Sequence, residues 1–504
     1  MPIRHRAALK FLLIATLLLV TTGLLGACET TPADPGSPVD PAKSGFSLSG
    51  YDQHTLDLTA SGIQAKDVQS VRVGGIRAFD VKPHPDQTQK TAVQSQLLRF
   101  TLQGQPLPGL AAIVIHTAAG DHTLPQTVRY LPPLDPRFAR FAAIGASLTQ
   151  GVQAGVPSHR GSLYSPPAQL ARQIRAFCGL PLPVHEFLPG ITPADIGPPP
   201  TCGGPSVAGV VTSQFAKVIP KFKDPITGEL TYAAARIDAD IEVRNLGVGG
   251  AKVHDMVHGP QQDNVGINFT SNLVYAPYTG FLQPVQSTQL HHLEALKPTL
   301  IISTDLMAND IVQAVLGADD IDPKLVTPHA QLAADLQEMV TRLAATGAEV
   351  YLATMPLPTA LPAVKEKRAL MLASGSTAAE VDARLAQIDK ATLAANQTLR
   401  DIVKPWPKVH IVDLAAAVDQ VVKAGGLQVG TTQLTTRKLG GLLGLDGVHF
   451  SNTGYGFVAN LFVDAINATL KTKVPRIDLV EVLRTDPESP EALGKAGLKP
   501  GLCD

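Results

Sequence analysis

Three side chains in this sequence have the types and the spacing that nucleophilic catalysis needs. Ser147 ends the run "RFAAIGAS", and Asp446 and His449 stand three residues apart in "DGVHFSNTGYG". A serine hydroxyl becomes a nucleophile when a neighbouring imidazole removes its proton, and a carboxylate near that histidine can hold its other ring nitrogen. This set predicts acyl transfer through an acyl-serine, with no metal or cofactor. The ordinary alternative is a serine that satisfies backbone groups in a turn.

Two more segments offer hydrogen-bond donors for a developing negative charge. Gly250, in "NLGVGGA", has a backbone N–H that no Cβ screens, and Asn309, in "MAND", has a side-chain amide. Because Gly249 is adjacent, the N–H donor could be either of the two glycines. Gly250 also suits an ordinary turn, and the pair Asn309 and Asp310 suits the cap of a following helix, a role that fits Asp310.

The serine, the glycines and the asparagine each follow an apolar run, which indicates how the chain positions them. Between residues 138 and 472, five such runs alternate with helical patterns: "RFAAIGAS", "IEVRNLGV", "PTLIISTDLM", "AEVYLATMP" and "VHIVDLAA". This alternation predicts an α/β fold with a parallel sheet covered by helices on both faces. Ligands of such sheets bind at the carboxyl ends of the strands, so we expect the segments of Ser147, Gly250 and Asn309 to meet there.

Two of the helical patterns have recognisable ends. Thr327 and Pro328 provide a capping residue and a first-turn proline, and Gly347 ends that helix. Thr377 and Glu380 form a capping box before a second helix. The apolar positions expected to face the core are Leu332, Leu336, Met339 and Leu343 in the first helix and Val381, Leu385, Ile388, Leu399 and Ile402 in the second.

Four blocks in this order resemble those of the SGNH or GDSL hydrolase family, over about residues 138 to 470. They are "GASL", "NLGVGGA", "AND" and "DGVHFSNTGYG". The resemblance implies a flavodoxin-like, three-layer α/β/α domain that cleaves esters or thioesters. It assigns Ser147 as the nucleophile and Asp446 and His449 as the other members of a catalytic triad. It also implies an oxyanion hole that consists of Ser147, Gly250 and Asn309.

Two positions depart from the family's pattern. Ala146 stands where the family commonly has an aspartate before the serine, and Ala308 where it has a glycine before the asparagine. Ala146 removes a carboxylate that would organise the nucleophile loop, but no group that transfers protons or stabilises charge. Ala308 adds a methyl group beside the oxyanion donor, which narrows the site if that backbone needs positive φ. We expect activity to survive the change at Ala146, with a less rigid loop.

Residues 45 to 133 have a different pattern. Short alternating runs such as "QSVRVGG", "LLRFTLQG" and "AAIVIHTAAG" are separated by Gly, Pro and Asp turns, which predicts the antiparallel strands of a small all-β sandwich. The phrases "VRVGGIRAFDV" and "VIHTAAGDHTLPQTVRYL" resemble the IPT/TIG type of immunoglobulin-like domain. Because such folds serve many purposes, we expect a spacer or packing domain rather than a carbohydrate-binding module.

The first 27 residues have the features of an export signal. A basic start precedes an apolar stretch, from residue 11 to about residue 20, that is short for a membrane span. Gly26 and Ala27 before Cys28 resemble the lipobox of bacterial lipoproteins, which implies acylation of Cys28 and anchoring to a membrane of the bacterial envelope. The alternatives are an ordinary secretory peptide and a retained transmembrane helix. Residues 28 to 44 have the composition of a flexible tether.

Export would place the remaining thiols in an oxidising compartment. Cys178 and Cys202 flank the proline-rich part of a long insertion, which extends from about residue 178 to 240. Closing this loop would stabilise the fold by about 3 kcal/mol on the entropy model. We therefore predict a disulfide between Cys178 and Cys202, which leaves Cys503 unpaired. The spacing of these cysteines is not that of a metal site.

Composition argues against some partners and leaves the substrate open. The 504 residues include 42 Lys and Arg against 43 Asp and Glu, without a basic stripe, so we do not expect a nucleic-acid partner. A second insertion, residues 266 to 290, is apolar and aromatic, which favours an acyl or aryl ester as substrate. The alternatives are an acetyl esterase acting on polysaccharide and a non-catalytic binding lipoprotein. Residues 473 to 504 are expected to form a C-terminal extension.

Overall fold

The computed structural model describes residues 45–49, 55–61, 67–83, 95–102, 108–182, 191–196, 221–223, 230–232, 238, 241–259, 271, 274, 288–317 and 320–499. The predicted export signal and tether, Cys28, Cys202, Cys503 and nearly all of the insertion 266–290 lie outside the described residues. In the part of the chain that is described, no helix combines the length and the hydropathy needed to cross a membrane.

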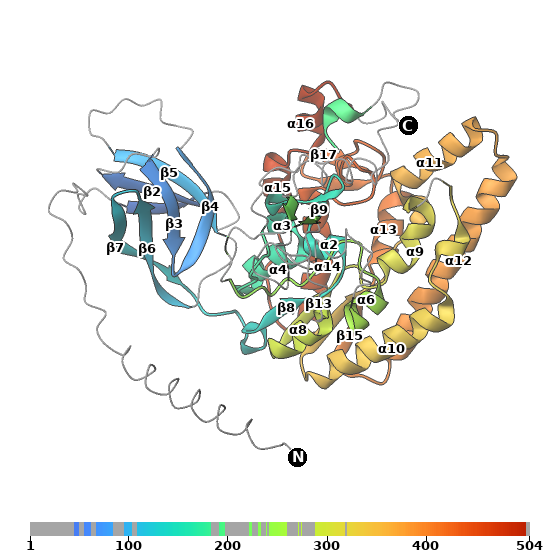
Figure 1. The fold of residues 1–504 in the computed structure, drawn as a ribbon, viewed down its shortest axis with the longest axis horizontal. Helices are drawn as coiled ribbons and strands as arrows, with labels where there is room; N and C mark the ends of the chain where they lie inside the picture. Colours follow the sequence, from blue (N-terminus) through green and yellow to red (C-terminus); the bar gives the residue numbers. More distant parts are fainter. Residues whose placement is uncertain are drawn as a thin grey trace, which may run out of the picture.

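The N-terminal strands pair antiparallel in the order β1-β2-β5-β4-β3-β6-β7 (Figure 1). They are β1 (Gly45–Ser49), β2 (Thr55–Ser61), β3 (Val68–Val73), β4 (Ile76–Pro83), β5 (Ser95–Leu102), β6 (Gly109–Thr117) and β7 (Gly120–Tyr130). The first residues of β4 pair with β3 and later ones pair with β5, so β4 joins two groups of strands. Val71, Val73, Ile113 and Ile115 share the buried core. The predicted antiparallel strands are confirmed, and the IPT/TIG-like sandwich stays a prediction.

A sheet of four parallel strands carries the predicted chemistry. The strands β8 (Phe141–Ala143), β13 (Leu300–Ser303), β14 (Glu349–Ala353) and β15 (Val409–Val412) are hydrogen-bonded in the order β15-β14-β13-β8. The second predicted strand is reduced to one parallel bridge between Ala143 and Asn245. Backbone hydrogen bonds flank this bridge, from Ala143 N–H to Arg244 O at 2.8 Å and from Leu246 N–H to Ala143 O at 2.9 Å. With this segment included, the order in chain numbering is 2-1-3-4-5.

Alternate positions of the strands enter two separate cores, one on each face of the sheet. On one face, Ile301 and Val350 pack with α6 (Val253–His258), α8 (Gln289–Ala295), α9 (Ala308–Leu316), α10 (His329–Ala345), α11 (Pro362–Ala373) and α12 (Ala378–Val403). On the other face, Ile302 and Tyr351 pack with α4 (Pro166–Ile174), α13 (Leu414–Lys423) and α14 (Asn452–Leu470). The predicted α/β fold with a covered parallel sheet is therefore confirmed.

The two helices with predicted ends both form, but only one has the predicted cap. Before α12, Thr377 Oγ1 accepts the Glu380 N–H at 3.3 Å and Glu380 Oε2 accepts the Thr377 N–H at 3.1 Å, which is the predicted capping box. Helix α10 begins one residue later than predicted, because Pro328 occupies the N-cap position and no side chain caps the helix. The apolar positions predicted for both helices are buried or half-buried.

Short elements connect these layers. The two-stranded antiparallel pairs are β9 (Val152–Gln153) with β10 (Val156–Pro157), β11 (Lys221–Lys223) with β12 (Leu230–Tyr232), and β16 (Leu427–Val429) with β17 (Thr432–Leu434). The short helices are α2 (Ser147–Gln150) and α3 (His159–Tyr164), and 3₁₀ turns span Pro136–Phe138, Pro193–Asp195, Pro323–Leu325 and Pro358–Ala360.

The predicted C-terminal extension packs onto the start of α14. It contains α15 (Leu479–Thr485) and α16 (Pro490–Lys495). The buried Asp486 accepts the backbone N–H and the hydroxyl of Thr453 through Oδ2, each at 2.7 Å. A Cβ on Gly441 would lie only 2.6 Å from Pro490 Cδ. The described part of the extension is therefore joined closely to the sheet domain.

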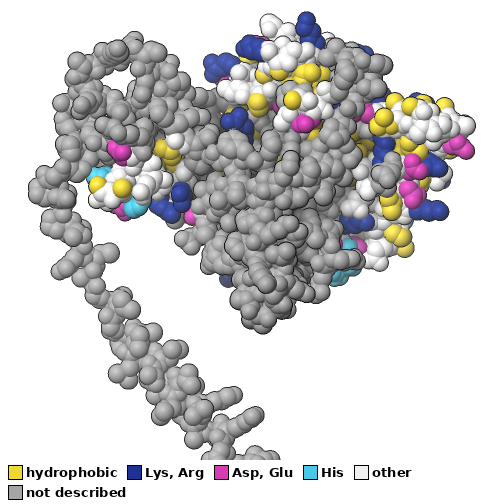
Figure 2. All heavy atoms as spheres, turned by 45° about the horizontal axis from the view of Figure 1, so that its top comes forward, with side chains coloured by type: hydrophobic (Ala, Val, Ile, Leu, Met, Phe, Trp, Pro, Cys, Tyr) yellow, Lys and Arg dark blue, Asp and Glu magenta, His cyan; other side chains and the backbone are white. Residues whose placement is uncertain are grey.

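Charges of both signs are mixed on the described surface. Figure 2 shows Lys, Arg, Asp and Glu side chains interspersed over the described helices on one face. Some of them pair directly, as Arg368 does with Asp382 at 2.6 Å and Arg400 with Asp413 at 2.7 Å. Mixed signs of this kind do not create a strong field of one sign. That nucleic acid is not a partner stays a prediction.

Candidate active site

A sharp turn places Ser147 at the carboxyl end of β8. The strand ends at Ala143, and Ser147 is the first residue of α2. A Cβ on Gly145 would lie 2.3 Å from Thr149 Oγ1 and 2.6 Å from Asp305 Oδ1, so only glycine permits this close packing. Ser147 is half-buried and lines a pocket. The predicted nucleophile therefore faces a pocket at the carboxyl edge of the sheet.

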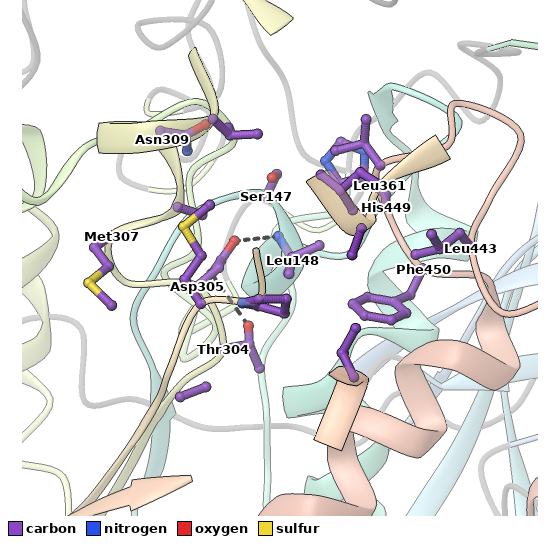
Figure 3. A pocket seen from close by; sticks show the side chains of 18 of the residues that line it. Ser147, Leu148, Thr304, Asp305, Met307, Asn309, Leu361, Leu443, His449 and Phe450 are labelled. Carbon is purple, nitrogen blue, oxygen red and sulfur yellow. Dashed lines mark hydrogen bonds between the residues drawn. The ribbon is translucent and has the colours of Figure 1, made fainter. Parts of the chain in front are cut away.

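A buried carboxylate that follows β13 holds the nucleophile loop (Figure 3). Asp305 Oδ1 accepts the N–H of Ala146 at 2.9 Å, the N–H of Thr149 at 3.3 Å and the Thr149 hydroxyl at 2.7 Å. Its Oδ2 accepts the N–H of Leu148 at 2.6 Å. Burial raises the pKa of Asp305 above its usual value, and these hydrogen bonds oppose the rise. The N–H of Ser147 has no acceptor among the described residues and is left for a ligand.

Asp305 supplies the support that the sequence pattern lacks at Ala146. Sequence reasoning did not identify this residue, which stands four positions before Asn309 in "TDLMAND". Its hydrogen bond to Leu148 spans 157 residues of chain, so no local pattern links the two. The one available signal was an acidic side chain directly after a buried apolar run.

The histidine and its carboxylate meet within one tight turn. His449 Nδ1 and Asp446 Oδ2 are 2.6 Å apart, and both residues are buried. Asp446 Oδ1 also accepts the backbone N–H groups of Val448 and His449 at 2.9 Å each. Burial by itself would raise the pKa of Asp446, but the charge of His449 and these hydrogen bonds outweigh it and hold the pKa below its usual value. The ionised carboxylate can therefore fix the ring through Nδ1.

Ser147, His449 and Asn309 face one pocket, as the sequence pattern predicted. In Figure 3 the Ser147 side chain lies between the Asn309 side chain and the His449 ring. No hydrogen bond joins Ser147 to His449 within the described part of the chain. Such a bond often forms fully only when substrate binds. The structure thus brings the predicted nucleophile and base to one pocket but not into direct contact.

One hydrogen bond distinguishes Gly249 from Gly250. The Gly249 N–H donates to Gln150 Oε1 at 2.8 Å, and a Cβ on Gly249 would lie 3.8 Å from Ser147 Cβ. Gly250 has a φ of 87°, and its N–H has no acceptor among the described residues. The glycine loop therefore lies beside the serine, and Gly250 is the better candidate for an oxyanion donor.

Asn309 is held by the same loop. Its Nδ2 donates one hydrogen to the Ala251 carbonyl oxygen at 3.0 Å, and the second amide hydrogen stays available for a ligand. The preceding Ala308 is the first residue of α9 and is not one of the described residues with positive φ. The methyl group that departs from the family's pattern therefore causes no backbone strain.

Asp310 caps a helix, but not the one that sequence reasoning assigned to it. Its Oδ2 accepts the N–H of Val253 at 3.0 Å, at the first turn of α6, whereas α9 has no side-chain cap. Burial raises the pKa of Asp310 to about 6. Asp310 thus ties the segment of Asn309 to the helix that follows Gly250.

The walls of the pocket are mainly apolar. They belong to the segments after β13 and β14, to α9 and α13, and to the histidine loop. The apolar lining residues include Leu306, Met307, Val312, Ala353, Met355, Leu361, Val418, Leu443, Val448 and Phe450. A pocket with such walls and a few polar groups suits a ligand with an apolar portion.

A carboxyl group of the C-terminal extension lies behind the histidine loop. A Cβ on Gly444 would lie 2.8 Å from Glu488 Oε2, an oxygen that is buried without a hydrogen-bond partner among the described residues. Burial raises the pKa of Glu488 to about 8, and the charges of Asp486 and Asp446 add to the rise. At neutral pH Glu488 is therefore mainly protonated. Sequence reasoning did not identify this contact either.

Cys178 is a free thiol, which contradicts the predicted disulfide with Cys202. The side chain is 2% exposed and belongs to the apolar core that also contains Ile174 and Leu180. Burial raises the pKa of the Cys178 thiol to about 12. The thiol packs as a small apolar group, so the loop-closure argument for a disulfide fails at this position.

Comparisons with known proteins add little to this geometry. No protein-family model matches the sequence, and no curated protein matches it. Among solved structures, the crystal structure of an acetyl xylan esterase is similar with a TM-score of 0.24 and 14% sequence identity, over 44% of this chain and 78% of that one. A TM-score of this size supports no argument about fold or activity.

Proposed function

We propose that this protein is a serine ester hydrolase of the SGNH/GDSL type, which cleaves acyl esters or thioesters through an acyl-enzyme at Ser147. The observation that carries the proposal is the shared pocket of Ser147 and His449, with the ring of His449 held by Asp446 at 2.6 Å. These are the three groups that a Ser-His-Asp triad requires.

The arrangement of the sheet supports this proposal. The order 2-1-3-4-5, with the bridge at Asn245 as the second segment, is that of flavodoxin-like sheets. Helices cover both faces, and Ser147, Asn309 and Gly250 follow the carboxyl ends of β8, β13 and the bridging segment, respectively. Ligands of such sheets bind at this edge.

In the first step Ser147 Oγ attacks the acyl carbon while His449 Nε2 takes its proton. Asp446 keeps Nδ1 of the ring occupied and stabilises the imidazolium that forms. The negative charge on the acyl oxygen is met by the N–H groups of Ser147 and Gly250 and by the amide of Asn309. All three donors retain a hydrogen that is unused within the described residues.

In the second step the imidazolium gives its proton to the leaving alcohol or thiol, and the acyl group stays on Ser147. Water then attacks the acyl-serine with His449 again as the base, which releases the acid and restores the serine. The chain's own residues supply every proton transfer in this sequence.

The apolar walls favour an ester whose acyl group is itself apolar. Leu361, Val418 and Phe450 can contact methylene groups, and each buried methylene contributes about 0.8 kcal/mol. We therefore propose that activity rises from acetyl to longer acyl esters of one alcohol. Highest activity on acetyl esters would instead favour the acetyl esterase alternative.

A fluorophosphonate probe tests the nucleophile. The probe should label Ser147 in the folded protein. Ser147→Ala and His449→Ala should both lose nearly all hydrolysis of the acetyl to longer acyl esters. Ser158→Ala is the matched control, since Ser158 caps α3 and is not a pocket residue. Ester cleavage that persists in Ser147→Ala would place the nucleophile elsewhere, and the absence of any ester or thioester cleavage would favour a binding lipoprotein.

We also propose that the protein is exported and anchored through acylated Cys28, on the sequence pattern alone. Cys28→Ser should release the protein from bacterial membranes. Quantitative membrane association of this variant after a salt wash would contradict the anchor.

A further inference from the structure

Two histidines of α6 face a buried carboxylate of α10, away from the candidate active site. His254 and His258 stand four residues apart on one face of α6, and their ring centroids are 4.6 Å apart. Asp335 lies opposite them on α10, and its side chain is 3% exposed. None of these three residues lines the pocket of Ser147. The proposed hydrolysis gives this cluster no role.

The distances within the cluster fit ligands around a common point better than direct ion pairs. His254 Nδ1 is 3.4 Å from Asp335 Oδ2, and His258 Nε2 is 3.5 Å from Asp335 Oδ1. Charge-assisted hydrogen bonds are shorter, at about 2.7 to 2.9 Å. Two ligands of a tetrahedral zinc ion, each about 2.0 to 2.1 Å from the metal, are about 3.3 Å apart. The two distances from the histidines to Asp335 are close to that value, and the ligand atoms of all three residues lie within 4.8 Å of one another.

A fourth donor and an outer partner complete the arrangement. Glu338, one turn after Asp335, has Oε2 at 3.7 Å from His258 Nε2, while its Oε1 is 3.5 Å from Arg342. Gln331 donates to both oxygens of Asp335, at 2.9 and 3.0 Å. Outer hydrogen bonds of this kind orient a ligating carboxylate. The histidines are 43% and 42% exposed, so an ion can reach them from solvent.

We propose that His254 Nδ1, His258 Nε2 and Asp335 bind one divalent transition-metal ion, with Glu338 or water as the fourth ligand. Two imidazoles with carboxylate oxygens form a donor set that suits zinc and similar divalent transition-metal ions. Calcium and magnesium instead take oxygen ligands. The four side chains come from two helices, so the bound ion links α6 to α10.

The ion has a structural consequence because of where α6 begins. Val253, its first residue, follows Gly250 by three positions, and Asp310 holds the Val253 N–H at 3.0 Å. An ion that links α6 to α10 therefore fixes the helix that anchors the glycine loop. The binding itself does not depend on the proposed hydrolase activity.

The test uses the full chain without an affinity tag, after removal of bound metal with a chelator. Titration with Zn²⁺ should show one ion per chain at the strongest site, and the thermal unfolding midpoint should rise with zinc concentration, as it does when a ligand binds only the folded state. Co²⁺ at the same site should give the intense visible absorption of tetrahedral coordination.

Variants separate this site from adventitious binding. His258→Gln changes a side chain that is 42% exposed and should remove the strong site without affecting the fold. Gln331→Leu should weaken binding by about 10- to 100-fold, because Gln331 only orients Asp335. His329→Gln, an exposed histidine near the start of α10, is the matched control and should bind as the wild type does. Equal zinc affinity in the wild type and in His258→Gln would overturn the proposal, as would the absence of a strong site in the wild type.

Discussion

The nucleophile loop and the histidine loop of the candidate active site are each held by a buried aspartate, but over very different lengths of chain. Asp446 is three residues before the histidine that it orients, and it also binds two N–H groups of its own turn. Asp305 reaches Leu148 across 157 residues. The contact between Asp446 and His449 lies within a short sequence motif. The contact between Asp305 and Leu148 forms because the sheet places β13 beside β8.

The two carboxylates also differ in charge environment. Asp446 faces an imidazole, and its pKa is below the usual value in spite of burial. Among the described residues Asp305 accepts hydrogen bonds from N–H groups and hydroxyls, and burial raises its pKa. In the proposed reaction Asp446 would therefore stabilise charge, whereas Asp305 maintains the shape of the loop. Substitutions at the two positions should therefore have different effects on kcat and on stability.

The largest effect is expected at the histidine loop. Asp446→Asn keeps an oxygen for the N–H groups of Val448 and His449, but the neutral amide cannot stabilise the imidazolium or fix the right tautomer. We expect kcat to fall by about 10⁴-fold, with a small change in KM. Steady-state kinetics on one ester measures this, and a loss below tenfold would remove Asp446 from the triad.

Asp305→Asn should lower kcat by less, on the order of 100-fold, because it moves the nucleophile rather than removing a reacting group. It should also destabilise the fold by about 1 to 3 kcal/mol, since the amide nitrogen cannot accept the Leu148 N–H. Fluorophosphonate labelling of Ser147 should slow in parallel with kcat. The matched control is Asp478→Asn, which weakens the exposed cap of α15 and should leave kcat unchanged. If Asp305→Asn and Asp478→Asn have the same kcat, Asp305 contributes to stability and not to catalysis.

Ala146→Asp tests whether the loop has room for the family's usual carboxylate. Ala146 is fully buried, and its N–H donates to Asp305. A second carboxylate would be buried beside the first without a counter-charge, so we expect a loss of about 3 kcal/mol of stability and lower activity. Ala146→Ser, which adds no charge, is the control. An increase in activity with Ala146→Asp would show that Asp305 does not replace the missing group.

The same contrast between local and distant contacts explains what could be predicted from the sequence. The apolar runs of β8, β13, β14 and β15 and the capping box of Thr377 and Glu380 are local patterns, and the structure confirms them. The predicted second strand survives only as the bridge at Asn245, because the N–H groups of Arg244 and Asn245 donate to the Gly179 carbonyl oxygen rather than to a neighbouring strand.

The residues that sequence reasoning missed depend on tertiary packing. Asp305, Gln150 and Glu488 each contact a loop that is remote in sequence, and no periodicity or motif marks them. The disulfide argument failed for the same reason, since the spacing of Cys178 and Cys202 contains no information about the apolar core that buries Cys178. Local motifs indicated the candidate residues, whereas tertiary packing determines how the loops that contain them are supported.

Glu488→Gln should have the smallest effect on kcat, because Glu488 lies behind the histidine loop, in the C-terminal extension, and not in the pocket. Its pKa is about 8 in the folded protein and near the ordinary glutamate value of 4.5 in the unfolded chain. Between these pH values the folded state holds a proton that the unfolded state has lost, so stability falls as pH rises, by at most about 1.4 kcal/mol per pH unit. Glu488→Gln removes this dependence.

The variant should therefore have nearly the stability of the wild type at pH 5 and exceed it at pH 8, by on the order of 2 to 4 kcal/mol. Urea unfolding at pH 5, 6.5 and 8 measures the difference, with Glu491→Gln as the control because Glu491 is exposed on α16. Parallel pH profiles for wild type and Glu488→Gln would show that Glu488 is ionised in the folded protein. A stabilised Glu488→Gln that keeps its kcat would show that the extension supports the histidine loop by packing alone, in contrast to Asp446, whose charge the proposed reaction needs.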